Sequence, residues 1–329
     1  MNSEKARVFV TQRLPKSVET RMSILFETRF SPHDGILGAD EILAGVSDCN
    51  VLVSTINDPL NADLINRLPE KVRLIAQYGN GVDNVDVVAA RKRNIVVTNT
   101  PSVVTEDTAN MAMALILSVP RRIVEGASLM AQKGKWPGWS PTWMLGRRLT
   151  GKSLGIVGMG RIGMAVAHRA RAVGLSIHYY SRSRHPEPVE SSLKATYWPQ
   201  LDDMLKEVDI VSLHTPHTPE TFRLLDRRRL ELLKPGAFVV NVSRSELIEE
   251  NALVDLVGSG HLSGAGLDVF EDAGGINPDL LELARQHKVV LTPHMASSTL
   301  EGRIEMGETV ILNIQVFMDS HNPPHRVLV

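Results

Sequence analysis

The segment GMGRIG, residues 158–163, places the strongest constraint on how this chain can fold. It follows the apolar run KSLGIV and opens a stretch with helical patterning, so a strand must turn tightly into a helix there. Gly158 permits the tight turn, Gly160 lets the backbone approach a pyrophosphate, and Gly163 lets the helix pack closely on the strand. Free N–H groups at the helix N-terminus favour such a phosphate. The segment therefore predicts dinucleotide binding, and a glycine turn without a ligand is the alternative.

Apolar runs alternate with helical patterns along the rest of the chain. Amphipathic stretches such as 61–70 and 85–93 separate runs that are rich in β-branched residues, which is typical of βαβ units. The pattern predicts an α/β protein with two doubly wound parallel sheets. Strands are expected at residues 6–10, 49–55, 72–78 and 95–99, and in a second block at 152–158, 176–181, 207–216, 236–244, 262–270 and 288–294.

The length of 329 residues suits two domains rather than one. Between the two blocks of strands, residues 105–134 read as one long helix or two abutting helices. Pro120 must kink or split this segment because proline lacks a backbone donor. Residues 298–319, after the second block, have apolar residues at helical spacing and predict a further helix.

Composition excludes several classes of protein. With 43% hydrophobic and 22% charged residues the chain resembles ordinary globular proteins, and a formal net charge of −1 speaks against nucleic acid or an anionic membrane as partner. Its single cysteine, Cys49, excludes an intrachain disulfide and a thiolate metal cluster, and we expect no metal. Because no run of about 18 apolar residues occurs, we expect a cytoplasmic protein without a membrane span.

The residues that should recognise the adenosine ribose favour one cofactor over another. Dinucleotide-binding domains that use NAD usually carry an acid about 20 residues beyond the glycine segment. This chain has YSRSR at 180–184, with no acid before Glu187. Its two arginines, Arg182 and Arg184, and its two serines, Ser181 and Ser183, suit a 2′-phosphate, since arginine forms charge-assisted bonds with phosphate and serine adds a neutral donor. NADPH is therefore expected rather than NADH, and a solvated basic loop in an NAD enzyme is the alternative.

Two side chains near strand ends are candidates for chemistry. His294 follows the apolar run KVVLTP, and an imidazole at the carboxyl end of a buried strand is placed for proton transfer. A capping or hydrogen-bonded structural histidine is the alternative. Arg244 follows the run AFVVNVS, and its planar fork could bind a carboxylate. The alternative is a surface ion pair with Glu246 or Glu249.

Several motifs in the same order resemble the D-isomer-specific 2-hydroxyacid dehydrogenase family, most closely its glyoxylate/hydroxypyruvate reductase branch. The resemblance covers essentially the whole chain. One motif departs slightly, because Ser245 stands where glycine is usual. The motifs are YGNGVDNVD (78–86), GMGRIG (158–163), HTPHTPET (214–221), NVSRSELIEENAL (241–253), GLDVFE (266–271) and TPHMAS (292–297).

The resemblance implies the NADPH-dependent reduction of a small 2-keto acid, glyoxylate or hydroxypyruvate first, to the D-2-hydroxy acid. Asn80 and Gly81 should offer backbone N–H groups to the substrate carboxylate. Arg244 should bind the carboxylate and the keto oxygen, and His294 should protonate that oxygen while hydride reaches C2. Asp268 should contact the nicotinamide amide. The implied cofactor-binding residues are Gly158, Gly160, Arg161, Ile162, Gly163, Ser181, Arg182, His214, Thr215, Pro216, Thr221, Val242 and Asp268.

The resemblance also implies a domain organisation and an assembly. A dinucleotide-binding domain of residues 102–297 should be inserted into a substrate domain made of 1–101 and 298–329, with the site in the cleft between them. The segment KWPGWSPTW, 135–143, matches a part of this branch that crosses a dimer interface, and Trp139 should enter the neighbour's active site. Three tryptophans that merely fill an interface core are the alternative, which would still imply a homodimer.

The sequence departs from the family at one catalytic position. The family pairs its histidine with a glutamate just before a proline, in a segment like DVFExEP. Read without gaps from Asp268, those two positions are Ala273 and Gly274. Three interpretations stay open: Glu271 replaces the glutamate, the imidazole has no carboxylate partner and activity is reduced, or the local register differs or the sequence is altered there.

Two other functions stay open beside the leading one. The first is a binding protein on the same fold that senses the cofactor and catalyses little, which Ala273 favours. Arg244, His294 and the substrate loop oppose it. The second is the same enzyme with another 2-keto acid, such as a 2-ketogluconate or a phenylpyruvate-type acid.

Overall fold

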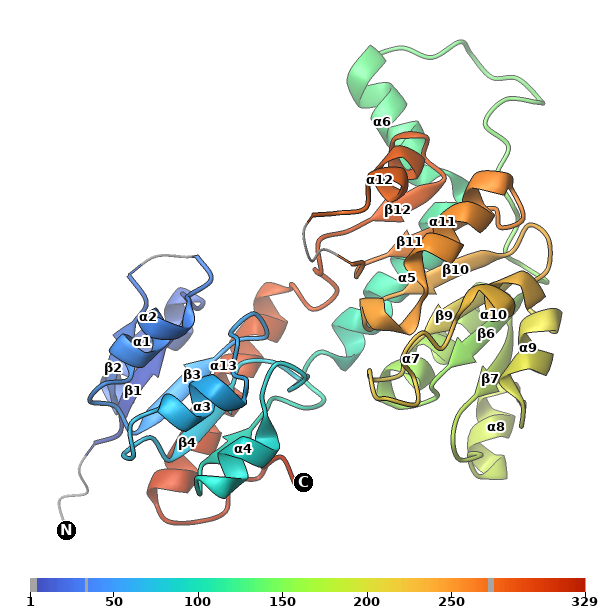
Figure 1. Cartoon of the computed structure of the whole chain (residues 1–329). Coiled ribbons are helices and arrows are strands. Elements are labelled where there is room, and N and C mark those ends of the chain that lie inside the picture. The colour runs from blue at the N-terminus through green and yellow to red at the C-terminus, as the bar shows by residue number, and fades with distance from the viewer. Residues whose placement is uncertain (1–4, 33–34, 272–274, 329) are drawn as a thin grey trace. The chain divides into compact units, whose positions relative to one another are not determined.

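The chain divides into two compact units in a computed structural model that describes residues 5–32, 35–271 and 275–328. Unit 1 consists of residues 1–104 and 298–329, and unit 2 of residues 105–297. Each unit is a parallel sheet with helices on both faces (Figure 1). The predicted fold class of two doubly wound parallel-sheet domains is confirmed.

Unit 1 is built on a five-stranded sheet in the order β2-β1-β3-β4-β5, which is the flavodoxin-like order. Every residue of β3 and β4 is buried, so these central strands read as continuous apolar runs. Edge strand β2 was not predicted, because its sequence ETRF is polar and half exposed. The strands are β1 (Arg7–Val10), β2 (Glu27–Phe30), β3 (Val51–Ser54), β4 (Leu74–Gln77) and β5 (Val96–Thr98).

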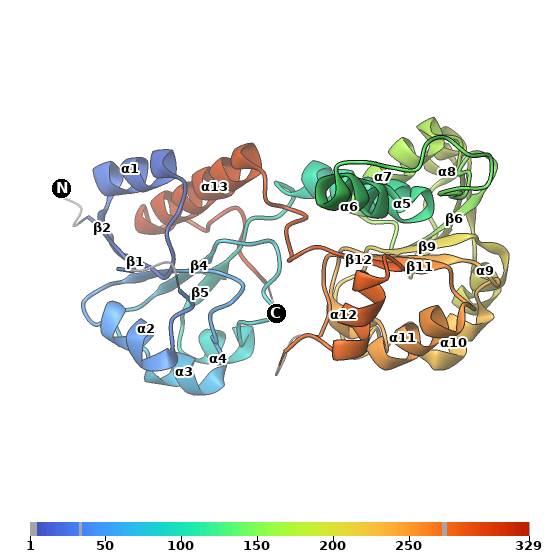
Figure 2. The same ribbon diagram turned by 90° about the horizontal axis from the view of Figure 1, so that it is seen from above.

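Helices cover both faces of this sheet (Figure 2). One face packs against α1 and α13, with Met22 and Val310 among the buried contacts, and the other packs against α2, α3 and α4. The helices are α1 (Lys16–Leu25), α2 (Ala39–Gly45), α3 (Ala62–Arg67), α4 (Val87–Lys92) and α13 (Leu300–Met318).

Unit 2 is built on a seven-stranded sheet in the order β12-β11-β10-β9-β6-β7-β8. The first six strands in sequence have the order of the dinucleotide-binding fold, and the strand order reverses between β6 and β9, where such sheets bind ligands. The unpredicted strand is again a short one at the edge, β8. The strands are β6 (Ser153–Val157), β7 (Ser176–Tyr180), β8 (Ala195–Tyr197), β9 (Ile210–Leu213), β10 (Phe238–Asn241), β11 (Gly264–Leu267) and β12 (Val289–Leu291).

The helices of unit 2 form two layers, one on each face of the sheet, and helix α6 extends beyond them (Figures 1 and 2). Helices α5, α7 and α8 pack on one face of the sheet, and α9 to α12 on the other. Helix α6 buries no side chain among its described residues. The helices are α5 (Thr105–Arg121), α6 (Ile123–Lys133), α7 (Arg161–Ala172), α8 (Glu187–Leu193), α9 (Leu201–Glu207), α10 (Arg227–Leu232), α11 (Glu250–Ser259) and α12 (Pro278–Arg285), with a short 3₁₀ helix η1 (Ser245–Leu247).

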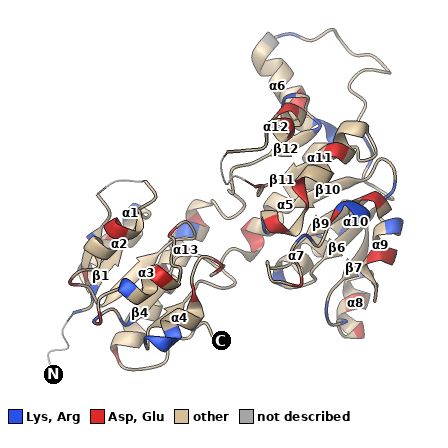
Figure 3. Ribbon diagram, viewed as in Figure 1, with Lys and Arg blue, Asp and Glu red and all other residues tan. Residues whose placement is uncertain are grey.

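The long helical segment is split, as Pro120 required. The break falls two residues after the proline, where Arg122 has a left-handed backbone with φ of 53°. Pro120 itself lies in the last turn of α5, and its carbonyl accepts a 2.8 Å hydrogen bond from Arg147 N. Within the described residues, every helix is too short or too polar to cross a bilayer. Acidic and basic residues are interspersed along the helices of both units (Figure 3).

Candidate active site

The carboxyl edge of the unit 2 sheet gathers most of the predicted site residues. Parallel strands end at the same edge, so segments far apart in sequence meet there. The glycine loop (158–163) follows β6, the ribose turn (180–184) follows β7, His214 follows β9, Val242 to Arg244 follow β10, Asp268 follows β11 and His294 follows β12.

The glycine loop turns β6 into α7 as its sequence predicted. Gly158 has a φ of +97°, and a Cβ there would lie 2.8 Å from the backbone carbonyl of His214. At Gly163 a Cβ would collide with the carbonyl oxygen of Gly158. Both glycines are therefore required by the fold itself. Arg161 and Ile162 begin α7; Arg161 is exposed, whereas Ile162 is partly buried against the core of unit 2.

Gly160 is different, and it tests whether the loop fits a dinucleotide. Its φ is −77°, and a Cβ at this position would have no neighbour within 4 Å. Nothing in the fold excludes a side chain there, but a side chain would fill the space over the N-terminus of α7. No side chain caps that terminus, so its N–H groups remain available to a phosphate. The loop thus fits the pyrophosphate of a dinucleotide.

In the ribose turn, Arg182 has an exposed side chain, whereas Arg184 is held in an ion pair. The pKa of Glu220 is lowered mainly by a hydrogen bond from Thr218, with a smaller contribution from the Arg182 charge. Arg184 instead donates from Nε and Nη2 to the two oxygens of Glu190, at 3.0 and 2.8 Å. Ser181 Oγ donates to the carbonyl of Ser183 at 2.6 Å. Arg182 is therefore the guanidinium of this turn that can meet a 2′-phosphate without breaking an ion pair.

His214 opens the loop that the sequence placed on the nicotinamide side. The residue keeps some exposure, but its Nδ1 is buried without a partner among the described residues, and desolvation lowers its pKa to about 3. The ring is therefore neutral, with Nε2 2.8 Å from Ser212 Oγ. Further along, Thr221 Oγ1 donates to the carbonyl of Pro216 at 2.8 Å and stabilises the loop internally. Thr215, which follows His214 directly, is partly exposed.

A buried asparagine fixes the backbone that carries Arg244. Asn241 ends β10, and its side chain accepts from Ser243 N at 3.0 Å and donates to the carbonyl of Arg244 at 2.8 Å. Val242 between them is buried. The Arg244 side chain is half-buried, and its Nη1 donates to the carbonyl of Ser243 at 2.7 Å.

The two glutamates considered as surface partners of Arg244 are engaged elsewhere. Glu246 accepts from Ser245 Oγ at 3.0 Å, and Glu249 accepts from Arg227 N at 2.9 Å. Neither of these two contacts involves Arg244.

His294 sits in a strained loop that Asp268 holds in place. The backbone of His294 has a φ of 50°, in the left-handed region that non-glycine residues seldom adopt. Asp268 is fully buried, and its carbonyl accepts from His294 N at 2.9 Å. Its carboxylate accepts from Thr292 Oγ1 at 2.6 Å, Met295 N at 2.9 Å and Ala296 N at 2.8 Å. The exposed imidazole thus projects from a loop whose shape one carboxylate determines.

The segment that should supply the family's glutamate is described in part. Ala273 lies outside the described residues. Glu271 is exposed, and its N–H donates to the buried Glu250 carboxylate at 2.8 Å. Burial, with a smaller contribution from the Glu271 charge, raises the pKa of Glu250. The backbone of Glu271 is thus tied to Glu250, and Glu271 as the replacement partner of His294 stays a prediction.

In unit 1, the substrate loop (78–86) offers unpaired backbone donors. The carbonyl of Gly79 accepts from Thr100 N at 3.0 Å, and the carbonyl of Asn80 accepts from the Asn99 side chain at 2.7 Å. The N–H groups of Asn80 and Gly81 donate no hydrogen bond to any described residue. Two adjacent N–H groups without partners can bind a carboxylate.

A buried polar network beneath this loop was not predicted from the sequence. Gln77 ends β4 and is fully buried, and its Nε2 donates to Asn84 Oδ1 at 2.8 Å and to the carbonyl of Gly81 at 3.3 Å. Ser54 Oγ donates to Gln77 Oε1 at 2.6 Å. Asn84 Nδ2 donates to the carbonyls of Thr55 and Asp58, both at 2.9 Å. The only sequence signal was a polar residue ending each of two apolar strands.

Asp58 completes that network with a buried carboxyl group. Its Oδ2 accepts from Thr11 Oγ1 and Thr55 N, both at 2.6 Å, while Oδ1 is buried with no partner among the described residues. Desolvation raises the pKa of Asp58. The carboxyl ends of β1, β3 and β4 are thus joined under the substrate loop.

The arm that follows α6 exposes aromatic surface. Trp136 and Trp143 stack on each other with ring centroids 5.7 Å apart. Trp139 lies between them in sequence and is 83% exposed. The stack therefore involves two of the three tryptophans and leaves Trp139 uncovered.

Comparison with known proteins gives consistent matches along the chain. The family described as D-isomer specific 2-hydroxyacid dehydrogenase, NAD binding domain, matches residues 113–296. A glyoxylate reductase of Thermococcus litoralis is 42% identical, over 98% of this chain and 97% of its own. A glyoxylate reductase of Korarchaeum cryptofilum is 43% identical, over 98% and 96% of the two chains.

Solved structures match as extensively. The TT0316 protein from Thermus thermophilus has a TM-score of 0.89 and 41% identity, covering 98% of this chain and 100% of its own. An NADPH-dependent glyoxylate/hydroxypyruvate reductase from Sinorhizobium meliloti, in complex with NADP and malonate, has a TM-score of 0.83 and 31% identity, covering 98% and 97%.

Proposed function

Because the chain belongs to the D-isomer-specific 2-hydroxyacid dehydrogenases and is an NAD(P)-dependent oxidoreductase, we propose that it reduces glyoxylate or hydroxypyruvate to the D-2-hydroxy acid with NADPH. The observation that carries the proposal is the placement of Arg244 and His294. They follow β10 and β12, on either side of β11, at the sheet edge that also bears the glycine loop. Relatives named glyoxylate reductase support the choice of substrate.

The glycine loop and the α7 N-terminus would hold the pyrophosphate, and Arg182 the 2′-phosphate. When bound, the nicotinamide supplies the hydride that reduces C2 of the keto acid. The His214 loop would face the nicotinamide. The expected contact of the Asp268 side chain with the nicotinamide amide is not supported, because this carboxylate is fully buried and bonded to the His294 loop. The S. meliloti relative solved with NADP supports this choice of cofactor.

The remaining chemistry belongs to side chains and N–H groups of the chain. The Arg244 fork binds the substrate carboxylate and the keto oxygen, and it stabilises negative charge as that oxygen becomes an alkoxide. His294 holds the proton that neutralises the alkoxide. The N–H groups of Asn80 and Gly81 bind the carboxylate.

We further propose that the protein is a homodimer that uses α6 and the arm. Ile123 and Met130 on α6 are 52% and 47% exposed, and Trp139 on the arm is 83% exposed. Monomeric proteins seldom leave so much apolar surface together uncovered. A second copy of the chain is the partner that this surface fits, with Trp139 entering the neighbour's site.

Ala273 favours a second candidate, a cofactor-binding protein of the same fold with weak catalysis. One experiment separates the two. Oxidation of NADPH and of NADH is followed by absorbance with glyoxylate, hydroxypyruvate, 2-ketogluconate and phenylpyruvate. The proposal expects turnover with glyoxylate or hydroxypyruvate and a higher kcat/KM with NADPH. Cofactor binding without turnover of any keto acid would favour the binding protein.

Variants test the assigned residues in the same assay. Arg244→Ala should lower kcat/KM by about 10²–10³-fold, the scale of a lost oxyanion donor, and Arg244→Lys should rescue little because a point charge cannot replace the fork. Arg182→Ala should weaken the binding of NADPH by roughly 1–3 kcal/mol and leave the binding of NADH unchanged. Arg285→Ala is the matched control, because Arg285 is an exposed arginine at the end of α12. Near-native turnover of Arg244→Lys would refute the role of Arg244.

A further inference from the structure

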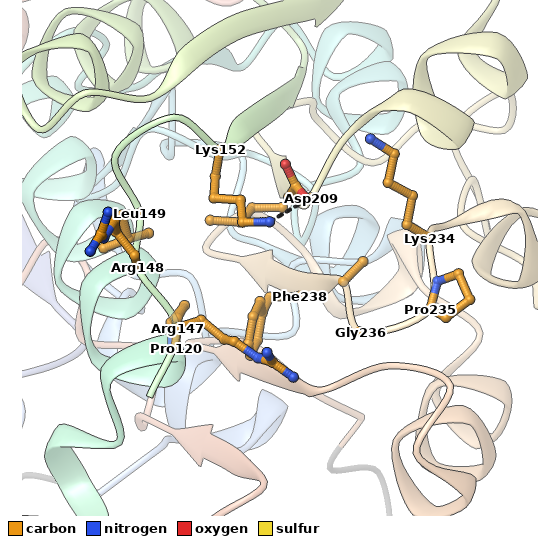
Figure 4. Close-up of a pocket in the computed structure, with 12 residues that line it drawn as sticks. Pro120, Arg147, Arg148, Leu149, Lys152, Asp209, Lys234, Pro235, Gly236 and Phe238 are labelled. Atoms are coloured by element: carbon orange, nitrogen blue, oxygen red, sulfur yellow. Dashed lines mark hydrogen bonds and ion pairs between the residues drawn. The ribbon is translucent and has the colours of Figure 1, made fainter. Parts of the chain in front are cut away.

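A cavity of about 210 Å³ lies in unit 2 at the amino edge of the sheet (Figure 4). Lys152 immediately precedes β6, Asp209 precedes β9 and Ala237 precedes β10, and all three line it. The glycine loop follows the carboxyl end of β6. The cavity is therefore separated from the cofactor loop by the length of a strand, and none of the proposed chemistry uses it.

Four cationic side chains line this cavity: Arg147, Arg148, Lys152 and Lys234. Arg147 and Arg148 are exposed, and neither guanidinium has a hydrogen-bond or ion-pair partner among the described residues. Lys234 Nζ donates to the carbonyl of Glu207 at 2.6 Å, which leaves its charge uncompensated by that contact. Figure 4 shows Arg148 beside Leu149 on one side of the cavity, Arg147 extending past Phe238, and Lys234 on the side opposite Arg148.

The acidic residue of the lining, Asp209, is already engaged. Asp209 Oδ2 accepts from Ser153 N and Ser153 Oγ, both at 2.9 Å, and Oδ1 pairs with Lys152 Nζ at 3.3 Å. These contacts lower the pKa of Asp209 although burial opposes them, so the group is ionised. Lys152 and Asp209 offset each other, and the charges of Arg147, Arg148 and Lys234 remain.

Part of the lining is apolar, and the size of the cavity limits the ligand. Pro120, Leu149 and Phe238 are the larger apolar residues of the lining. At about 210 Å³ the cavity is smaller than the pockets of roughly 300–1,000 Å³ that take drug-sized ligands. Guanidinium groups bind carboxylates and phosphates through paired N–H donors.

We propose that this cavity binds a small organic anion with two or more carboxylate or phosphate groups. Arg147 and Arg148 bind anionic groups of the ligand at separate points of the lining, Lys234 binds the ligand from the opposite side, and the body of the ligand lies on Leu149 and Phe238. The site is distinct from the cofactor and substrate sites, and it does not depend on the proposed function.

Titration calorimetry tests the proposal on protein saturated with NADP⁺, so that the glycine loop is occupied. Citrate is the carboxylate probe and inorganic pyrophosphate the phosphate probe. The Arg147→Gln/Arg148→Gln variant should lose one binding site per chain, or bind at it at least about 10-fold more weakly, and raising the salt should weaken the native site. The probe with the lower Kd identifies the anionic group.

The matched control is Arg285→Gln/Lys288→Gln, which removes two cations from unit 2 outside the cavity. It should keep the native isotherm. Should the double arginine variant fail to fold, Lys234→Gln is tested in its place with the same expectation. Identical isotherms for the native protein and the cavity variants would overturn the proposal. So would a cavity variant that changes only the oligomeric mass, because the cavity would then be a subunit contact.

Discussion

At the scale of single residues, His294 depends on a carboxylate that is not its proton partner. A left-handed backbone at a non-glycine residue costs of order 1 kcal/mol and persists only where neighbours enforce it. Asp268 supplies that enforcement, since both of its oxygens and its carbonyl bond the segment from Thr292 to Ala296. We therefore expect Asp268 to act by positioning the imidazole, in addition to any contact with the nicotinamide.

The change Asp268→Asn separates these two roles. An amide group replaces one acceptor oxygen, so at least one buried N–H of the His294 loop loses its partner. The free energy of unfolding of the cofactor-free protein should fall by about 1–3 kcal/mol, and kcat should fall together with it. Urea unfolding and steady-state kinetics measure the two. If unfolding is unchanged and only the KM for NADPH rises, Asp268 serves the cofactor alone.

Among the helices, strands and loops, the substrate loop is held by a side chain from the strand before it. Gln77→Leu removes the donors to Gly81 and Asn84 while keeping the volume similar. Because the loop backbone would then lose its fixed orientation, the KM for the keto acid should rise about 10-fold, the effect of roughly one lost hydrogen bond, with little change in the KM for NADPH. Steady-state kinetics with each substrate varied in turn measures this split.

Asn84→Asp is the second test of the same network. It keeps the acceptor for Gln77 and removes the donor to Thr55 and Asp58, so it should change the same KM in the same direction. Equal effects of both variants on the two KM values would indicate general destabilisation instead of a local effect on the loop.

The ribose turn (180–184) is held in place by an ion pair between Arg184 and Glu190. Hydrogen bonds from Arg184 and then Tyr179 lower the pKa of Glu190 from 4.5 to about 2. A lowered folded-state pKa means that the ionised group stabilises the fold above about pH 4.5, and that this contribution is lost as the pH falls towards 2. Glu190→Gln should therefore lower stability at pH 7 and matter progressively less below pH 4.5.

Urea unfolding of the native protein and Glu190→Gln at pH 7, 5, 4 and 3 measures that difference. The exposed Glu187→Gln, at the start of the same helix, serves as a control for simple loss of charge. A difference between native and Glu190→Gln that stays constant down to pH 3 would contradict the role of the carboxylate.

At the scale of the whole molecule, α6 and the arm are the parts that the chain alone leaves uncovered. Light scattering should give the mass of a dimer for the native protein. Ile123→Asp/Met130→Asp should shift it towards the monomer, because two charges would enter an apolar interface. Trp139→Ala should keep the dimer mass and raise the KM for the keto acid. A native monomer at micromolar concentration would refute the assembly.

The sequence by itself determined the sheets, the glycine loop and the broad placement of Arg244 and His294. These follow from local rules: strand and helix periodicity is readable over a few residues, and Gly158 and Gly163 are required by backbone geometry that no other residue allows. The short edge strands β2 and β8 escaped prediction, because an edge strand is defined by its single neighbour rather than by its own apolar pattern.

Only the tertiary structure decided which polar side chains are held by other residues of the chain and which remain available to a ligand. Arg182 and Arg184 are equivalent in sequence, yet Arg184 is held by Glu190 because helix α8 brings that acid beside the turn. In the same way, the substrate loop is held by hydrogen bonds among Gln77, Ser54 and Asn84, because three segments of the chain meet at one sheet edge. Hydrogen-bond partners are settled by which elements pack together, and that information lies in contacts between distant parts of the chain.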